Sequence, residues 1–431
     1  MLYITKGTKN TIISSDELRK LVFQSLDRLG ERSRVLVIPP DITRIHSRAG
    51  EITKYIYDYF SEKLCDILPA LGTHNPMTNK EIEKMFPDIP IELFRIHNWR
   101  KDIKTIGYVP AEYVKKISAN AGNFDWPVQL NKMIINGGYD LIISVGQVVP
   151  HEVIGMANYN KNIFVGTGGP ESINLSHYLG ACYGMEKIMG QTENPVRAVM
   201  NYASDKYISN LPVLYIQTVL GNDVDGNHQL RGLYIGDDIE CFISASELSE
   251  EINIKKLDKT LKKVVVYLNP SEYKSTWLGN KSIYRTRMAM ADNAELLILA
   301  PGIKTFGEDA EIDRLIRKYG YSGTSAIKEA VKNNIDLRGN LSAAAHLIHG
   351  SSEDRFNIKY CTGGLNKTEI ESVGFEYGVL DKMMKIYNPE KLKDGYNIMP
   401  DGEQIYYISN PALGLWMLKV KSQKSKVKSK K

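Results

Sequence analysis

The sequence predicts an α/β fold with two α/β domains, and two observations support this fold class. Short runs rich in β-branched residues, each bounded by turn residues, occur at 34–38, 139–145, 213–219, 263–268 and 295–300. Helical patterns of apolar residues lie between these runs, an alternation typical of parallel sheets covered by helices. The chain has 431 residues, of which 43% are hydrophobic and 24% charged. This composition is globular, and the length is sufficient for more than one hydrophobic core.

The expected elements follow one another along the chain. Ser14 and Glu17 have the spacing of a capping box, so a first helix should begin there and lead into the strand at 34–38, with a helix over 48–62 after it. In the second block the patterns predict strands at 263–268 and 295–300 and helices at 308–318, 323–333 and 376–386. A boundary within 255–262 gives domains at 1–258 and 259–418. The lysine-rich remainder, 419–431, has the composition of a disordered tail.

The composition also excludes several classes of protein. No stretch approaches 18 consecutive apolar residues, and no basic-then-apolar leader begins the chain, so we expect a cytoplasmic protein. The four cysteines lie far apart without a CxxC pair, which argues against a disulfide framework or a thiolate metal site. The formal net charge is +5, but seven lysines lie in 419–431 without interleaved aromatic residues. We therefore expect neither nucleic acid nor a membrane as a partner.

Polar residues that follow strands are the first candidates for a site, because ligands of open α/β sheets bind beyond the carboxyl ends of the strands. The strand at 34–38 leads into PPDITR, which places Asp41, Thr43 and Arg44 in the turn before the next helix. Arg44 could grip a carboxylate or phosphate with two parallel N–H bonds. Alternatively, Asp41 only caps the helix and Arg44 is a surface charge.

Two further loops carry histidines. His74 follows an apolar run in GTHNP, within a strand-to-helix loop, where it is either a chemical group or simply a polar loop residue. His151 follows the strand at 139–145, and Lys161, the turn GTGGP (166–170) and His177 come after it. The glycines Gly166, Gly168 and Gly169 match neither GxxxxGK[ST] nor GxGxxG, so nucleotide-fold motifs do not explain them. The alternative is a plain turn with a solvated lysine and a core histidine.

A fourth candidate is the pair His346 and His349, whose i, i+3 spacing on a helix could offer two imidazoles to one metal. No Asp or Glu lies at a spacing from them that would indicate a third metal ligand. These histidines are therefore either structural or substrate-lining.

Together, DITR (41–44), GTHNPMT (72–78) and the series His151, Lys161 and His177 resemble the catalytic subunit of the lactate racemase family, whose cofactor is a nickel-pincer nucleotide. The resemblance implies that Lys161 anchors a pyridinium mononucleotide covalently and that His177 is a nickel ligand, with Asp41 and Thr43 beside the cofactor. Two sulfurs, a ring carbon and one imidazole would hold the Ni(II), a donor set suited to square-planar geometry.

The same resemblance implies a mechanism. His74 and His151 would be the two acid/base groups, one on each face of a 2-hydroxyacid, and the C2 hydride would pass to the cofactor and back through a 2-keto acid. Arg44 would bind the substrate carboxylate. A weaker resemblance continues at Trp277 and Lys281 and at 300–307, and places Trp277, Lys281 and His346 at the substrate. The domain at 1–258 would then anchor the cofactor, and 259–418 would close an interdomain cleft that holds the active site.

The sequence departs from the family pattern in two places. Ala157, Asn158 and Tyr159 replace a Ser-Gly-Gly run before the anchoring lysine. Leu341 stands near the place of a tryptophan of the lactate pocket. With Asn280 beside Lys281, this change suggests a larger or more hydroxylated acid than lactate.

The function that follows is that of a racemase or epimerase, an isomerase, whose partners are a small 2-hydroxyacid and the enzymes that build the cofactor. Two other classes stay open. One is an NAD(P)-dependent or other metal-dependent hydroxyacid dehydrogenase or lyase, and the other is a non-catalytic protein that binds the cofactor or nickel. The sequence does not choose the hydroxyacid or the oligomeric state.

Overall fold

The computed structural model describes residues 1–223, 227–412 and 414–419. The lysine-rich tail that the composition predicts to be disordered therefore lies outside the described residues from position 420 on. The chain forms two compact α/β units: Met1–Asn253 with Thr324–His349, and Ile254–Gly323 with the residues from Gly350 on. This division confirms the predicted fold class of two α/β domains.

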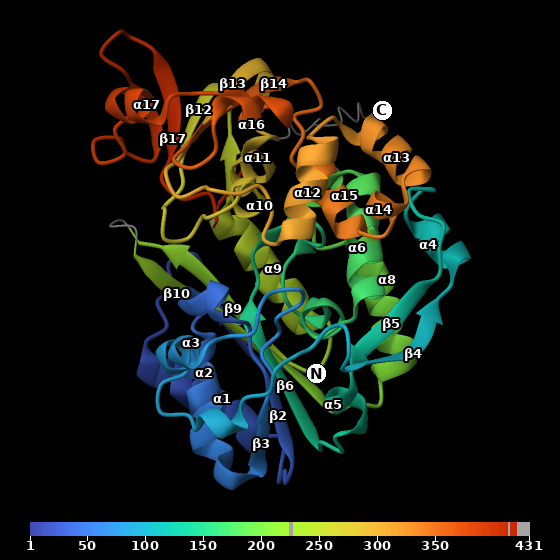
Figure 1. The fold of residues 1–431 in the computed structure, drawn as a ribbon. Helices are drawn as coiled ribbons and strands as arrows, with labels where there is room; N and C mark the ends of the chain where they lie inside the picture. The colour runs from blue at the N-terminus through green and yellow to red at the C-terminus, as the bar shows by residue number, and fades with distance from the viewer. Residues whose placement is uncertain (224–226, 413, 420–431) are drawn as a thin grey trace, which may run out of the picture. The chain divides into compact units, whose positions relative to one another are not determined.

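The first unit is built on a six-stranded sheet in the order β1-β10-β9-β6-β2-β3 (Figure 1). Its strands are β1 (Leu2–Gly7), β2 (Val35–Ile38), β3 (Leu64–Ile67), β6 (Leu141–Gln147), β9 (Val213–Asn222) and β10 (His228–Gly236). β3, β2, β6 and β9 run parallel, whereas β10 and β1 are antiparallel to their neighbours. The predicted strands at 34–38, 139–145 and 213–219 are thus confirmed within a few residues.

Helices cover both faces of this sheet. Helix α1 (Ser15–Asp27) begins at the predicted cap, where the Ser14 side chain accepts a hydrogen bond from the Glu17 backbone N–H. With α2 (Ala49–Phe60) and α3 (Asn79–Met85) it forms one apolar core with Leu233 and other sheet residues. Side chains alternate along a strand, so the neighbouring Gly232 faces the other way, toward Leu248 of α9 (Glu240–Asn253).

The first unit also contains several shorter strands and helices. They are the hairpin of β4 (Ile103–Val109) and β5 (Trp126–Asn131), the short pair β7 (Pro150–His151) and β8 (Gly155–Met156), α4 (Ala111–Ile117), α5 (Lys132–Asn136), the π-helical turn η4 (Asn162–Gly166), α6 (Pro170–Tyr183), α7 (Met185–Ile188) and α8 (Pro195–Ala203).

The stretch 324–349 differs from the domain ranges expected from the sequence. It forms α13 (Thr324–Asn333), α14 (Ile335–Arg338) and α15 (Leu341–His349), which belong to the first unit although flanking residues belong to the second. The Ser342 backbone N–H and hydroxyl donate to the Asn174 side-chain oxygen of α6, at 3.1 and 2.7 Å. His346, one turn further along α15, is therefore carried by the unit that carries His151 and His177.

The second unit is built on another six-stranded sheet, in the order β15-β14-β13-β12-β17-β16. Its strands are β12 (Leu261–Tyr267), β13 (Met290–Ala300), β14 (Phe356–Thr362), β15 (Glu376–Tyr377), β16 (Gly395–Ile398) and β17 (Gln404–Ile408), with only β16 antiparallel. Its helices include α10 (Thr276–Gly279), α11 (Lys281–Thr286), α12 (Ala310–Tyr319), α16 (Lys367–Ser372) and α17 (Leu380–Ile386), and β11 (Ile254–Leu257) pairs with β18 (Leu415–Leu418). The helix predicted from 376 begins four residues later, because Glu376 and Tyr377 pair with β14.

Candidate active site

The candidate residues of the first unit lie where three neighbouring parallel strands end. Asp41 and Arg44 follow β2, the loop Gly72–His74 follows β3, and His151 follows β6. β3 lies on one side of β2 and β6 on the other, so the chain reverses its order across the sheet at β2 and β6. Loops that leave such a point diverge and open a crevice at the carboxyl edge, which is where ligands of these folds bind.

Asp41 links the first two loops. It is 5% exposed, and one carboxylate oxygen accepts from the Thr43 backbone N–H at 3.1 Å and from the Thr43 hydroxyl. The other oxygen lies 2.6 Å from Nδ1 of His74. Burial by itself would raise the pKa of Asp41, but the bonds from His74 and Thr43 outweigh it and hold the pKa below the ordinary value. Asp41 therefore caps the turn that follows β2, as the alternative interpretation of the sequence had it, and it also orients His74 as an ionised carboxylate.

His74 presents one ring nitrogen to the site. Its Nδ1 carries a proton, because an ionised Asp41 can only accept, so Nε2 is left for a substrate. The loop that carries His74 is tied to the lysine-bearing segment, because the Gly72 backbone N–H donates to the Gly166 carbonyl at 2.8 Å. Gly72 has φ 56°, a conformation that glycine adopts without strain.

Arg44 is half-buried in the turn η1 (Ile42–Ser47), with a non-helical backbone at φ −115° and ψ 28°. Its guanidinium forms no ion pair with any carboxylate in the part of the chain that the structure describes. Its charge nevertheless lowers the pKa of both His151 and Lys161, so it lies close to them. A guanidinium in this state can bind an anion with two N–H bonds.

His151 has the opposite tautomer to His74. The Val153 backbone N–H donates to its Nδ1 at 3.1 Å, so in the neutral ring the proton is on Nε2. Burial first, and then the charges of Lys161 and Arg44, hold its pKa well below the ordinary value, although Glu152 opposes this shift. His151 is therefore a neutral N–H donor at neutral pH.

Lys161 is a half-buried amine whose pKa is lowered to about 8. Burial is the largest cause and the Arg44 charge the next, while Glu152 and Asp41 act in the opposite direction. No hydrogen bond or ion pair of the Nζ atom occurs with the described residues. A lysine with these properties is a far better nucleophile at neutral pH than a surface lysine.

His177 lies on α6 with one nitrogen fixed and the other available. Nδ1–H donates to the Ile173 carbonyl at 2.7 Å, so the lone pair is on Nε2. Burial lowers its pKa to about 4, partly opposed by the bond to Ile173 and reinforced by Lys161. A neutral imidazole whose second nitrogen is held by a carbonyl is the usual form of a histidine that ligates a metal.

The segment just before Lys161 adopts the backbone conformation that glycine favours, although it carries Asn158 and Tyr159. Their φ angles are 69° and 59°. A left-handed conformation costs a residue such as tyrosine about 1–3 kcal/mol. Asn158 and Tyr159 thus stand in place of the glycines of the family's Ser-Gly-Gly run, and φ at both positions lies in the region that glycine occupies readily.

Buried contacts offset this strain. The Asn158 side chain donates to Gln217 at 2.7 Å, and its oxygen lies against Gly146, where a Cβ would approach it to 2.6 Å. The Tyr159 ring stacks on Phe242 at 5.3 Å and packs against Tyr215 at 4.3 Å. Such ring pairs contribute about 0.5–1.5 kcal/mol each beyond area burial.

Arg197 of α8 holds the same segment through hydrogen bonds from its guanidinium. It is 2% exposed and donates to the Met156 carbonyl at 2.6 Å, to the Asn158 carbonyl at 3.2 Å and to the Asn160 side chain. Its guanidinium also lies 4.2 Å from the centre of the Phe242 ring. Among the described residues no carboxylate pairs with it, so its charge is held by carbonyl oxygens and aromatic faces.

The GTGGP turn after Lys161 is fixed by a buried histidine that sequence reasoning did not single out. His97 Nε2 donates to the Gly168 carbonyl at 3.1 Å, and its Nδ1 accepts from Asn131 at 3.0 Å. Burial lowers the pKa of His97 to about 4. The glycines are needed for close packing, since a Cβ on Gly168 would lie 1.9 Å from the Phe164 carbonyl.

Glu152 is the second site residue that the sequence did not indicate. Its carboxylate lies 3.9 Å from Nδ1 of His151 and raises the pKa of His151, Lys161, His177 and His346. One carboxylate therefore lies within electrostatic reach of all four groups. A glutamate next to a histidine in the sequence is not a recognisable motif, so only the structure shows that Glu152 belongs to the site.

His346 is 5% exposed on α15, and its pKa is lowered to about 3 by burial first and by His349 next. Trp277 and Lys281 belong to α10 and α11 of the second unit, in the segment that follows β12. The roles of these three residues at the substrate stay predictions.

Comparison with known proteins relates the first part of the chain to one family. Residues 8–188 match the family model described as the lactate racemase N-terminal domain, and this range contains every candidate residue from Asp41 to His177. The resemblance to the lactate racemase family that the sequence indicates is confirmed for this part of the chain.

Two solved structures share the fold. A protein from Thermotoga maritima aligns with a TM-score of 0.80 and 24% identity, over 94% of this chain and 98% of its own. The lactate racemase apoprotein from Thermoanaerobacterium thermosaccharolyticum aligns with a TM-score of 0.71 and 17% identity, over 96% of this chain and 94% of its own. No curated protein sequence matches the chain. None of the described helices is long and apolar enough to cross a membrane.

Proposed function

We propose that this protein is a racemase or epimerase that inverts C2 of a 2-hydroxyacid with a nickel-pincer nucleotide held on Lys161. One observation carries the proposal. The carboxyl edge of one sheet brings together a guanidinium, two histidines in opposite tautomers, an amine of lowered pKa and a histidine with an available lone pair. The lactate racemase N-terminal domain match supports this assignment.

The residues present fit the cofactor. The Lys161 amine would form the covalent link, and Nε2 of His177 would ligate nickel, with Asp41 and Thr43 beside the nucleotide. The described residues contain no group of three or more His, Cys, Asp or Glu placed to hold a metal ion. In this proposal the metal would be bound chiefly by cofactor sulfur and carbon, with His177 as the one imidazole from the protein. When bound, the cofactor supplies a reversible acceptor for the C2 hydride.

The chain's own residues bind and orient the substrate. Arg44 would bind the carboxylate with its two N–H groups, which fixes the acid relative to both histidines. Lys281, Trp277 and His346 would complete the substrate contacts.

His74 and His151 would move the hydroxyl proton. His74 offers a lone pair at Nε2, backed by the Asp41 carboxylate, so it can take the proton from one enantiomer. His74 would become an imidazolium in that step and would return the proton from the same nitrogen to the oxygen of the intermediate. His151 would donate a hydrogen bond from its Nε2–H to the substrate on the other face, and it would act as a base there in the tautomer that carries the proton on Nδ1.

Two residues of α15 bear on the substrate class. Leu341 and His346 would leave room and polarity beyond what lactate needs, so we propose a larger or more hydroxylated 2-hydroxyacid. Cofactor-building enzymes would be the partners that load Lys161.

Intact-mass measurement after co-expression with cofactor-building enzymes tests the covalent claim. We expect an adduct on the wild-type chain that maps to Lys161 and is absent from Lys161→Ala. Lys132→Ala, which changes another lysine of the same unit, is the matched control and should keep the adduct. Activity that depends on added NAD(P) and is indifferent to Lys161→Ala would contradict the proposal.

A further inference from the structure

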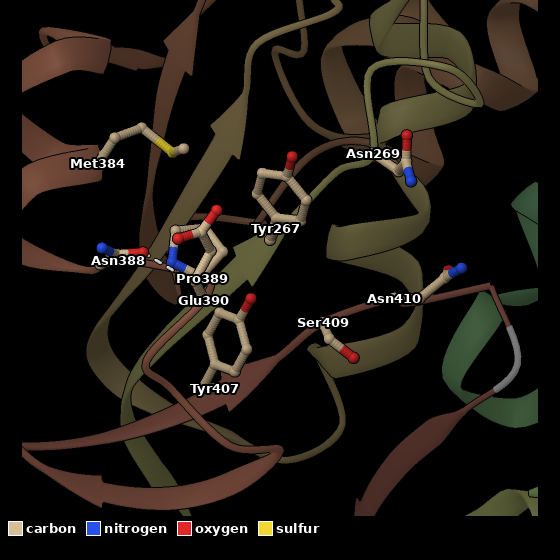
Figure 2. A pocket seen from close by; sticks show the side chains of 9 residues that line it. All are labelled: Tyr267, Asn269, Met384, Asn388, Pro389, Glu390, Tyr407, Ser409 and Asn410. Carbon is tan, nitrogen blue, oxygen red and sulfur yellow. Dashed lines mark hydrogen bonds between the residues drawn. The ribbon is translucent and has the colours of Figure 1, made fainter. Parts of the chain in front are cut away.

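A second candidate ligand site lies in the second unit, at the carboxyl ends of two neighbouring parallel strands. It is a cavity of about 620 Å³, within the size range of small-molecule pockets. The lining residues come from β12, α17 and β17 and from the segments that follow them. They are Tyr267, Asn269, Met384, Asn388, Pro389, Glu390, Tyr407, Ser409 and Asn410 (Figure 2).

The cavity, like the site of the first unit, lies at the carboxyl ends of neighbouring parallel strands. β13, β14 and β15 follow β12 on one side of it, whereas β17 pairs with its other side. The residues that follow β12 and β17 line the cavity together at the carboxyl ends of these two parallel strands. Tyr267 and Asn269 lie at the end of β12, and Tyr407 and Ser409 at the end of β17.

The loops around the cavity are fixed by their own amide side chains. The Asn388 oxygen accepts from the Glu390 backbone N–H at 2.9 Å, and the Asn269 oxygen accepts from the Ser271 backbone N–H at 2.9 Å. The Asn410 oxygen accepts from the Tyr273 hydroxyl at 3.1 Å and from the Ala412 backbone N–H at 2.9 Å. The cavity is thus preformed, which lowers the entropic cost of binding.

Two phenols and a carboxylate remain for a ligand. Figure 2 shows the Tyr267 and Tyr407 rings in the middle of the lining, with Glu390 on one side and Ser409 on the other. Within the described residues, neither phenol hydroxyl forms a hydrogen bond, and the Glu390 carboxylate forms no ion pair. Met384 and Pro389 add apolar surface.

The charge of the lining selects the kind of ligand. None of the nine lining residues is Lys, Arg or His, although Lys391 follows Glu390 in the chain. Asp394 adds a second carboxylate, which accepts from the Ser409 backbone N–H at 2.6 Å and from its hydroxyl at 2.8 Å. An anion would meet unfavourable charge here. An ammonium group would meet a carboxylate and the partly exposed ring of Tyr267, both of which attract cations.

We propose that this cavity binds a small organic ammonium compound, with Glu390 as its charge partner, the Tyr267 ring as its aromatic contact and the Tyr407 hydroxyl as a polar contact. The proposal does not rest on the reaction proposed for the first unit, because all nine lining residues belong to the second.

Isothermal titration calorimetry of the full chain tests it, with putrescine and tetramethylammonium as probes and with succinate and glucose as anionic and neutral comparisons. At about 0.1 M salt, which screens surface charge, we expect saturable binding of the two ammonium probes only. Glu390→Gln and Tyr267→Leu should each weaken it at least tenfold. Asp381→Asn, which removes an exposed carboxylate from α17, is the matched control and should leave binding unchanged.

Three results would overturn the proposal: no binding of either ammonium probe, binding of succinate or glucose alone, or equal weakening by Glu390→Gln and Asp381→Asn. Far-UV circular dichroism of each variant checks the fold. Because Tyr407 is 2% exposed, Tyr407→Phe serves as a second variant that keeps its packing and removes only the hydroxyl.

Discussion

Replacing Arg44 by glutamine should raise the pKa of the Lys161 amine and slow its acylation at neutral pH. With a pKa of about 8, roughly 9% of the amine is neutral at pH 7, against about 0.03% at the ordinary value of 10.5. The neutral fraction, which is the nucleophilic form, is thus about 300-fold larger than in an unfolded chain. Burial causes most of the shift and Arg44 the next part, so Arg44→Gln should raise the pKa while leaving it below 10.5.

The opposite change is expected at Glu152, whose charge raises the pKa of Lys161. Glu152→Gln should therefore lower that pKa further. Each unit of change alters the neutral fraction at pH 7 by up to tenfold, so rate changes of about threefold to tenfold in opposite directions are expected.

Competitive acetylation of the cofactor-free protein measures this directly. Native and urea-unfolded chains are labelled with different isotopes of acetic anhydride across pH 6–11, and the peptide that contains Lys161 is quantified by mass spectrometry. The native chain should titrate near pH 8. A Lys161 that titrates as it does in the unfolded chain, or variants of Arg44 and Glu152 that shift it in the same direction, would refute the reasoning.

Two further predictions concern the groups that fix the loop around Lys161. Since burial lowers the pKa of His97 to about 4 from about 6.5 in the unfolded chain, the unfolded state binds one more proton between these values. The stability that neutral His97 contributes is therefore complete above pH 6.5 and is lost as pH falls toward 4, with a slope of about 1.4 kcal/mol per pH unit. The free energy of unfolding, measured with urea between pH 4.5 and 7, should depend on pH less steeply in His97→Gln than in the wild type, by that amount. Equal slopes in the two proteins would contradict the lowered pKa of His97. Arg197→Met leaves two carbonyls and the Asn160 side chain without a donor, so unfolding free energy should fall by at least about 2 kcal/mol. Hydrogen exchange at 155–161 should also accelerate, and exchange no faster there than in Val199→Ala, a cavity variant of the same helix, would argue against a positioning role.

The sequence predicts the fold class and most strands because both depend on local patterns. The strands expected at 34–38 and 263–268 are β2 and β12, and the Ser14 cap starts α1 as expected. Periodicity reports which face of a helix is apolar but not which surface it meets. The packing of α15 on α6 was therefore not visible in the sequence, although the helical pattern at 323–333 was.

The sequence predicted those parts of the candidate site in which polar residues follow strands. It did not predict the parts that depend on single contacts between residues distant in the chain. A cap formed by Asp41 was one of two interpretations of the sequence, and the structure adds its bond to His74. The sequence showed that Tyr159 stands where the family pattern has a glycine before Lys161. It could not show that the residue takes a positive φ, because the stabilising contacts come from Tyr215, Phe242 and Arg197, which are distant in sequence.

The most direct test of the proposed function is inversion by the loaded protein. Holo-protein with the adduct on Lys161 is incubated in D₂O with single enantiomers of short 2-hydroxyacids, dicarboxylic hydroxyacids and aldonates, and the products are separated by chiral chromatography. We predict that at least one acid is converted to its opposite C2 configuration, that C2 retains its protium, and that His74→Ala and His151→Ala each abolish the conversion while the adduct persists. Failure of fully loaded protein to invert any acid in the panel, or inversion that survives both histidine variants, would contradict it.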